Sequence, residues 1–145
     1  MKLLLQRVRS ASVDVAGERV GEIGQGLLCL VGIEAHDDVA NVRAGIDKLL
    51  AYRVFSDAQG KMNLSVKDIG GGVLLVSQFT LAANTRKGLR PSFSGAAAPV
   101  LARDLYHEAL AYAATQIDDV AAGRFAADMQ VSLVNDGPVT FMLEN

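Results

Sequence analysis

The sequence predicts a single α/β domain, residues 1–145, built from short β-strands and two main helices. Three observations support this prediction. The chain is 50% hydrophobic and only 21% charged, so it can bury a sizeable core without disulfides. Short apolar stretches with strand character surround two longer segments of helical spacing. No repeat, low-complexity segment or linker divides the chain.

The strand that organises the domain lies in segment 70–81, which begins with three glycines. Residues 73–76 (Val-Leu-Leu-Val) show no polar alternation, a pattern typical of a strand covered on both faces. A polar cluster follows from Ser77, and sites are often built at such strand ends because the scaffold fixes their geometry. Alternatively, Ser77 and Thr80 have no role in a site, and their hydroxyls only form hydrogen bonds with nearby backbone. The pattern alone favours this second interpretation.

Other strands are predicted from apolar or alternating runs bounded by turn residues. They cover residues 2–8, 11–15, 18–23, 27–33, 53–55, 62–64, 129–134 and 139–143. A two-residue Ala-Gly turn at 16–17 predicts a hairpin between the second and third of these. Residues 135–138 (Asn-Asp-Gly-Pro) are predicted to form a turn between the last two.

Two helices are predicted from hydrophobic residues at helical spacing. The first has Asp37 as its N-cap and ends near Tyr52, and its apolar stripe contains Val39, Val42, Ile46, Leu49 and Leu50. The second has Pro99 in its first turn, where a helix accepts proline, and one of its faces contains Leu101, Leu105, Ala109 and Tyr112.

Composition excludes several classes of protein. The single cysteine, Cys29, rules out a disulfide framework and is interpreted as a small buried apolar residue. The N-terminal apolar run is short, with no long h-region or cleavage site, and no segment approaches the roughly 20 apolar residues that span a bilayer. We therefore expect a soluble, cytoplasmic protein without a membrane partner. The net charge of −2 gives no indication of DNA binding.

Positive charge is nevertheless concentrated in one region. Segment 69–103 contains no Asp or Glu, but it includes Arg86, Lys87, Arg90 and Arg103. A cationic patch beside the polar strand end would attract a phosphate, and a solvated loop with a few arginines explains the pattern equally well. The connection 82–97 is long enough to be functional, and its Arg-Pro-Ser-Phe run at 90–93 argues for order.

Several familiar chemistries are excluded. No Gly-x-Ser-x-Gly elbow surrounds Ser77, and His36 and His107 are isolated. One cysteine and two separate histidines give no metal-ligand spacing, and no nucleotide-binding loop is present, so we expect no metal and no cofactor. An enzyme with this sequence would use fixed backbone donors, hydroxyls and the substrate itself.

Segment 135–140 (Asn-Asp-Gly-Pro-Val-Thr) offers a second possible site. A cis Gly-Pro bond, which costs about 0.5–1 kcal/mol relative to trans, would turn two carbonyl oxygens in nearly the same direction. Such a pair would grip an ammonium group without any side chain. Because cis bonds are a small minority, the residues alone favour an ordinary trans turn.

Segments 77–80 (Ser-Gln-Phe-Thr) and 135–140 together resemble the two signature motifs of the D-aminoacyl-tRNA deacylases, the D-tyrosyl-tRNA deacylase family. The resemblance runs from Gln-Arg-Val at 6–8, through segment 90–93, to the C-terminal strand. One departure is Ala126, where the family is expected to have glycine. This change concerns the backbone near Phe125 rather than the activity.

The resemblance implies that the strands form a layered, barrel-like β-sheet, and that two such α/β subunits form a homodimer with active sites at the subunit interface. The expected reaction is hydrolysis of the ester between a D-amino acid, or glycine, and the 3′-terminal adenosine of tRNA. Gly137 and Pro138, joined by a cis bond, would enter the neighbouring subunit's pocket and hold the substrate's α-ammonium. An L side chain would then collide with the backbone, and a D side chain would point outward.

Further roles follow from the same resemblance. The strand-end residues Ser77, Gln78, Phe79 and Thr80 would line the pocket, with backbone N–H groups polarising the scissile carbonyl. Thr80 lacks a neighbouring base, so it is interpreted as a positioning group, with water attack assisted by the ribose 2′-hydroxyl.

The remaining assignments concern binding. Arg7 would brace the Gly-Pro turn or be a plain strand-end arginine. Phe125 and Met129 would contact the adenine, while a small phosphate footprint would involve Arg86, Lys87 and Arg90. The alternative to an enzyme is a non-catalytic dimeric module that binds amines or RNA 3′ ends.

Overall fold

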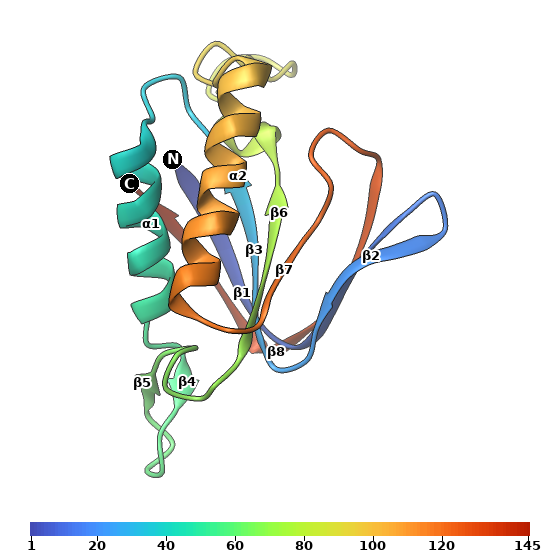
Figure 1. Cartoon of the computed structure of the whole chain (residues 1–145). Helices are drawn as coiled ribbons and strands as arrows, with labels where there is room; N and C mark the ends of the chain where they lie inside the picture. The colour runs from blue at the N-terminus through green and yellow to red at the C-terminus, as the bar shows by residue number, and fades with distance from the viewer.

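The computed structural model describes all 145 residues, Met1–Asn145. Its elements are β1 (Lys2–Val15), β2 (Glu18–Ile23), β3 (Gly26–Gly32), α1 (Val39–Ala51), β4 (Phe55–Ser56), β5 (Met62–Leu64), β6 (Gly72–Ser77), the 3-10 turn η1 (Phe79–Ala82), α2 (Pro99–Gln116), β7 (Val120–Ala122) and β8 (Met129–Glu144). The main sheet has the order β2-β1-β3-β6-β7, with β8 also paired to β1. It is a nearly closed, barrel-like sheet, and α1 and α2 lie side by side over one of its faces (Figure 1).

Strand β6 is buried on both sides, as the unbroken aliphatic run predicts. Val73 and Leu75 belong to the larger core beneath the two helices, whereas Leu74 and Val76 belong to a smaller core on the opposite face. Alternate residues of one strand therefore stabilise two separate layers. The strand pairs in parallel with β3 on one side and β7 on the other.

The prediction of separate strands at 2–8 and 11–15 is wrong, because β1 runs without interruption from Lys2 to Val15. Its first half pairs with β3 and its second half with β2, while β8 lies along both halves. A strand that changes its pairing partner partway along its length has the sequence pattern of two shorter strands. The predicted hairpin to β2 is confirmed, with positive φ at Ala16 and Gly17, as a two-residue hairpin turn requires.

The predicted turn at 135–138 is also wrong, since β8 is one strand from Met129 to Glu144. Gln6 of β1 faces Thr140, and Val8 faces Asn135. Arg7 alone therefore lies opposite the four residues 136–139, which form an outward bulge. Asn135 bridges the bulge, because its Oδ1 accepts the Val139 N–H at 2.9 Å and its Nδ2 donates to the Thr140 hydroxyl at 2.9 Å.

Both helices form close to the predicted positions. The N-cap of α1 is Asp38, which accepts the Asn41 N–H at 2.8 Å, and not Asp37. Asp37 is buried and accepts the α-ammonium of Met1 at 2.7 Å instead. Helix α2 begins at Pro99, and its buried face consists of Ala102, Leu105, Tyr106, Ala109 and Ala113. The predicted face therefore omitted Tyr106 and included the exposed Leu101.

Smaller differences concern short elements. The strand predicted at 53–55 forms at Phe55–Ser56, and both η1 and β7 are unpredicted. The connection 82–97 is ordered by backbone pairing, in which the Asn84 and Ser92 main chains exchange two hydrogen bonds. Cys29 is fully buried, and that burial raises the pKa of its thiol, as expected for an inert apolar residue. Neither helix has the length and hydrophobicity that a membrane span requires.

Candidate functional site

The end of β6 leads into a tight turn that presents backbone donors. The Gln78 N–H is held by the Val31 carbonyl at 2.8 Å, and η1 follows directly. The first hydrogen bond within the turn runs from Leu81 N–H to the Gln78 carbonyl at 3.3 Å. The N–H groups of Phe79 and Thr80 precede that bond, so the turn itself gives them no acceptor. Two adjacent amides are thus available to an incoming carbonyl oxygen.

A pocket of about 310 Å³ opens beside this turn. We call it the strand-end pocket, and its lining consists of Val76, Ser77, Gln78, Phe79, Phe125, Ala126, Ala127, Asp128, Met129 and Val131. Five predicted site residues therefore meet across a sequence distance of about 50 residues. Thr80 does not line the pocket, but it is linked to the lining because the Gln78 side-chain amide donates to its hydroxyl at 2.5 Å.

The opposite wall of the strand-end pocket is the segment between β7 and β8. Gly123 N–H donates to the Leu75 carbonyl at 3.0 Å, and Tyr106 Oη donates to the same oxygen at 2.8 Å. The Tyr106 ring lies 6.1 Å from the ring of Phe125, measured between centroids. Helix α2 therefore fixes both walls of the pocket through one buried tyrosine.

Two features of this segment extend the sequence analysis. Ala126 has a φ of +61°, a left-handed conformation that favours glycine and explains the expected family preference at this position. Asp128 is the one carboxylate in the lining, and sequence analysis did not identify it. The only indication in the sequence was that Asp128 precedes Met129, which was already a candidate binding residue.

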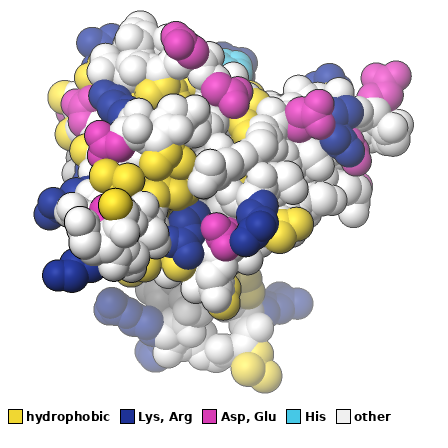
Figure 2. All heavy atoms as spheres, turned by 90° about the horizontal axis from the view of Figure 1, so that it is seen from below, with side chains coloured by type: hydrophobic (Ala, Val, Ile, Leu, Met, Phe, Trp, Pro, Cys, Tyr) yellow, Lys and Arg dark blue, Asp and Glu magenta, His cyan; other side chains and the backbone are white.

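The bulge of β8 carries Gly137 and Pro138, both exposed and joined by a cis peptide bond. Arg7 lies beneath it, mostly buried, with Nε donating to the Asp136 carbonyl at 2.9 Å and Nη1 to the Val54 carbonyl at 2.6 Å. Arg9 also lies near the Asp136 carboxylate, at 3.6 Å. Figure 2 views the molecule from below, where basic and acidic side chains lie close together among exposed hydrophobic ones.

Within one chain the bulge and the strand-end pocket lie apart. Ser77 pairs with Val31 of β3, and Val31 pairs with Leu3 of β1, so the end of β6 is level with Leu3. The bulge is level with Arg7 of β1. Four residues of extended strand separate the two levels, or about 13 Å. Strand β8 reaches the pocket only at its start, because Gly137 lies six residues beyond Val131, or about 20 Å along an extended strand. The two signature segments therefore do not form one site within a single subunit.

The predicted cationic residues Arg86, Lys87 and Arg90 are all exposed on the connection between η1 and α2. The same connection brings Phe93 onto Phe79, with ring centroids 5.1 Å apart. The basic residues are therefore attached to a segment that packs directly on the rim of the strand-end pocket.

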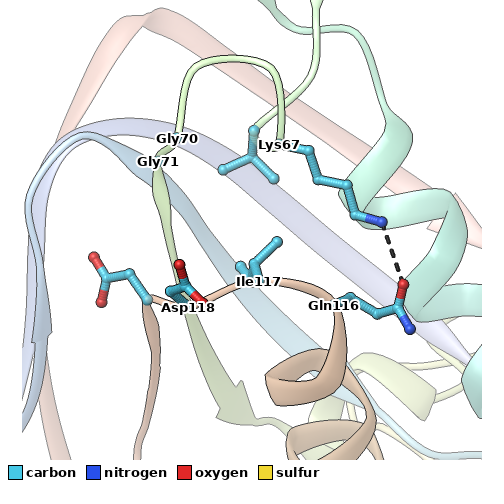
Figure 3. Close-up of a pocket in the computed structure, with 8 residues that line it drawn as sticks. Lys67, Gly70, Gly71, Gln116, Ile117 and Asp118 are labelled. Carbon is cyan, nitrogen blue, oxygen red and sulfur yellow. Dashed lines mark hydrogen bonds between the residues drawn. The ribbon is translucent and has the colours of Figure 1, made fainter.

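Two other features do not form part of this site. A hollow of about 290 Å³ lies between the start of β6 and the end of α2, where Lys67 donates to Gln116 at 3.4 Å (Figure 3). Its acidic groups are exposed, and it contains none of the predicted residues. Glu34, His36 and Asp37 lie close enough to share a metal ion, but both carboxylates accept the Met1 α-ammonium instead.

Comparisons with known proteins support one assignment. The family model described as "D-Tyr-tRNA(Tyr) deacylase" matches residues 4–144. The D-aminoacyl-tRNA deacylase of Stutzerimonas stutzeri (strain A1501) is 66% identical over 145 residues, covering 100% of both chains. That of Pseudomonas putida KT2440 is 65% identical over 144 residues, covering 99% of both.

Solved structures agree in fold. A chain described as "c-Myc DNA Unwinding Element Binding Protein" superposes with a TM-score of 0.95 at 39% identity, covering 100% of this chain and 99% of that one. A "probable eukaryotic D-amino acid tRNA deacylase" gives a TM-score of 0.85 at 16% identity, covering 98% and 97%, a likeness of fold alone.

The fold and the full-length matches define a hydrolase that acts on carboxylic ester bonds. The chain belongs to the D-Tyr-tRNA(Tyr) deacylase family, and its activity is that of a D-aminoacyl-tRNA deacylase. The family resemblance stated from the two motifs is thereby confirmed. The names of the curated relatives favour the enzyme over the non-catalytic binding module.

Proposed function

We propose that this enzyme hydrolyses D-aminoacyl-tRNA, and glycyl-tRNA, in a site completed by a second copy of the chain. The observation that carries the proposal is the separation of the two signature segments within one subunit. The bulge with Gly137 and Pro138 is exposed and braced by Arg7. A symmetric dimer would place each bulge over the partner's pocket and so create two equivalent sites.

The proposed selectivity is an exclusion by main chain. The carbonyl oxygens of Gly137 and Pro138 accept hydrogen bonds from the substrate's α-ammonium in the partner's pocket. The L side chain then collides with the backbone, whereas a D side chain points outward and is not read. Glycine has no side chain to reject, so the same clamp admits it.

The proposed chemistry uses the free amides of η1. The N–H groups of Phe79 and Thr80 donate to the scissile carbonyl oxygen and to the oxyanion that develops on it. Water attacks the carbonyl carbon with the ribose 2′-hydroxyl assisting. The bond to the 3′-oxygen breaks, that oxygen takes up a proton, and the free amino acid and tRNA leave. Thr80, held by Gln78, positions these groups and forms no covalent intermediate.

The terminal adenosine occupies the remaining lining. Phe125 and Met129 provide an aromatic and a thioether surface against which an adenine packs. Arg86, Lys87 and Arg90 lie outside the pocket and supply a small phosphate footprint, which suits an enzyme that serves many tRNAs through their shared 3′ end. The proposed location is the cytoplasm, where aminoacyl-tRNAs are made and used.

Deacylation of D-Tyr-tRNA and L-Tyr-tRNA by the purified protein tests this function. The D-ester should be hydrolysed at least about a hundredfold faster, because a steric clash with rigid backbone excludes the L-ester. Equal hydrolysis of both esters would contradict the clamp. Hydrolysis of neither ester would contradict the catalytic assignment.

A further inference from the structure

Another hollow, with a polar lining, lies at the end of η1 opposite to the strand-end pocket. Phe79, the first residue of η1, lines the strand-end pocket, and Ala82, the last, lines this hollow. Its volume is about 360 Å³. We call it the basic hollow, after Lys2 and Arg86, two cationic side chains that come to it from segments 84 residues apart.

The lining of the basic hollow contains more cationic than anionic side chains. Lys2 and Arg86 belong to none of the ion pairs of the molecule. Glu34 is the only carboxylate in the lining, and it accepts the α-ammonium of Met1 at 2.8 Å. The lining therefore carries two cations, Lys2 and Arg86, against one carboxylate, and its net charge is positive.

The walls of the basic hollow are held by backbone hydrogen bonds. Asn84 exchanges two backbone hydrogen bonds with Ser92, at 2.7 and 3.1 Å, and Gly95 accepts the Ala35 N–H at 3.0 Å. The Asn84 side chain also accepts the Arg86 N–H at 3.0 Å, which fixes the backbone from which the guanidinium extends. The cations are therefore attached to a preformed frame.

The position of the hollow relative to the strand-end pocket indicates which anion it receives. The four residues of η1 span roughly 8 Å at about 2 Å per residue. One or two nucleotides of a stacked single strand, at about 3.4 Å each, cover a similar length. A strand that runs along η1 from a terminal adenosine in the strand-end pocket would therefore bring one of its last phosphodiesters to the basic hollow.

We propose that the basic hollow binds a phosphodiester of the single-stranded 3′ end of tRNA, through Lys2 and Arg86. This inference rests on the proposed placement of the terminal adenosine. The inference assigns a direct phosphate contact to Arg86 but not to Lys87 or Arg90, which lie outside the hollow. It also assigns one to Lys2, which is far from the loop in the sequence.

Two minimal substrates test the proposal: the D-tyrosyl ester of adenosine, which has no phosphodiester, and that of the dinucleotide CpA, which has one. D-Tyr-tRNA is the third substrate. The variants are Lys2→Gln and Arg86→Gln, and the matched control is Lys61→Gln, an exposed lysine beside β5. For each combination, kcat and KM are measured over a range of salt concentrations.

Each hollow variant should raise KM about tenfold for CpA or tRNA esters, the worth of one charge-assisted contact. The adenosine ester should change less than twofold, as should Lys61→Gln on every substrate. For a hollow variant on tRNA, the slope of log(kcat/KM) against log salt should be shallower by about 0.7, because one single-strand phosphate contact is lost.

Three outcomes would overturn the proposal. Equal losses on the adenosine ester and on tRNA would show that the variants disturb the turn instead of a phosphate contact. Unchanged KM for tRNA would show that the hollow is not used. A loss on tRNA but not on CpA would move the contact to a more distant phosphate. Failure of the wild-type protein on D-Tyr-tRNA would instead contradict the proposed function itself.

Discussion

Ala126 and Asp128 are the two residues of the strand-end pocket whose roles depend most on the folded geometry. Ala126 adopts a left-handed backbone conformation, with its methyl group in the pocket lining. Asp128 brings the only titratable side chain into that lining. Each can be altered without removing a residue of the core.

Ala126→Gly should stabilise the protein. A residue with a Cβ disfavours φ near +60°, at a cost of about 1 kcal/mol that glycine avoids. The free energy of unfolding should rise by about this amount, with Tm higher by about 3 °C. Chemical and thermal unfolding measure both quantities. The control is Ala127→Gly, which has no positive φ and should destabilise; stabilisation by both variants would contradict the explanation.

Asp128→Asn distinguishes two chemistries. If the substrate's 2′-hydroxyl assists water, as proposed, removal of this carboxylate should change kcat for D-Tyr-tRNA by less than about fivefold. A general base would contribute about 10² to 10⁴. Single-turnover deacylation provides the measurement. A loss of a hundredfold or more with normal substrate binding would make Asp128 the base.

At the scale of elements, β6 and the bulge of β8 differ in how far the sequence predicts them. The run at 73–76 predicts β6 and its two-sided burial, since an unbroken aliphatic run bounded by glycines is typical of a strand covered on both faces. The continuity of β1 and β8 depends on which strand lies opposite, and this pairing is non-local. Strand β7, Val120–Ala122, is too short and too rich in alanine to show a pattern.

The candidate site, like the fold, is predicted from the sequence only in part. The motif at 77–80 is recognisable in the sequence, and Phe125 and Met129, expected from the family resemblance, line the same pocket. Asp128 was missed because an exposed aspartate in a loop has no distinguishing pattern. The outward bulge was missed because a Gly-Pro pair between two strands is typical of an ordinary hairpin turn.

Arg7→Lys should weaken the bulge. The guanidinium reaches the carbonyls of both Asp136 and Val54, and an ammonium group cannot reproduce that fork. The free energy of unfolding should fall by about 1.5–3 kcal/mol, the worth of a hydrogen bond from a charged group. Urea unfolding measures it. Arg9→Lys is the matched control, because Arg9 is exposed and donates to no backbone group; an equal loss there would contradict the bracing role.

At the scale of the whole molecule, the two chain ends are joined beside α1. The Met1 α-ammonium donates to Glu34 at 2.8 Å, to Asp37 at 2.7 Å and to the Asn145 carbonyl at 3.0 Å. Asn145 donates in return to the carbonyls of Met1 and Asn41. This arrangement fixes β1 and β8, the strands that carry Arg7 and the bulge.

The pH dependence of stability should reflect this junction. Burial alone would raise the pKa of Glu34, but the hydrogen bond and charge of the α-ammonium, together with the charges of Lys2 and His36, outweigh it and hold the pKa below its usual value. Glu34 therefore contributes stability that is present above the ordinary glutamate pKa and is lost as the pH falls through the lowered value. Wild type should exceed Glu34→Gln in unfolding free energy at pH 7, and the difference should shrink below about pH 4. A difference that grows on acidification would contradict the assignment.

Subunit complementation tests the shared active site most directly. Gly137→Ala disables the bulge, because its Cβ would lie 2.8 Å from Val139 and 3.0 Å from Arg7, at a φ of +135°. Ala127→Trp fills the strand-end pocket. Each variant alone should be inactive on D-Tyr-tRNA, and co-expressed subunits should recover about a quarter of wild-type activity, since half of the dimers would contain one complete site. Isolated mixed dimers that remain inactive would contradict the account.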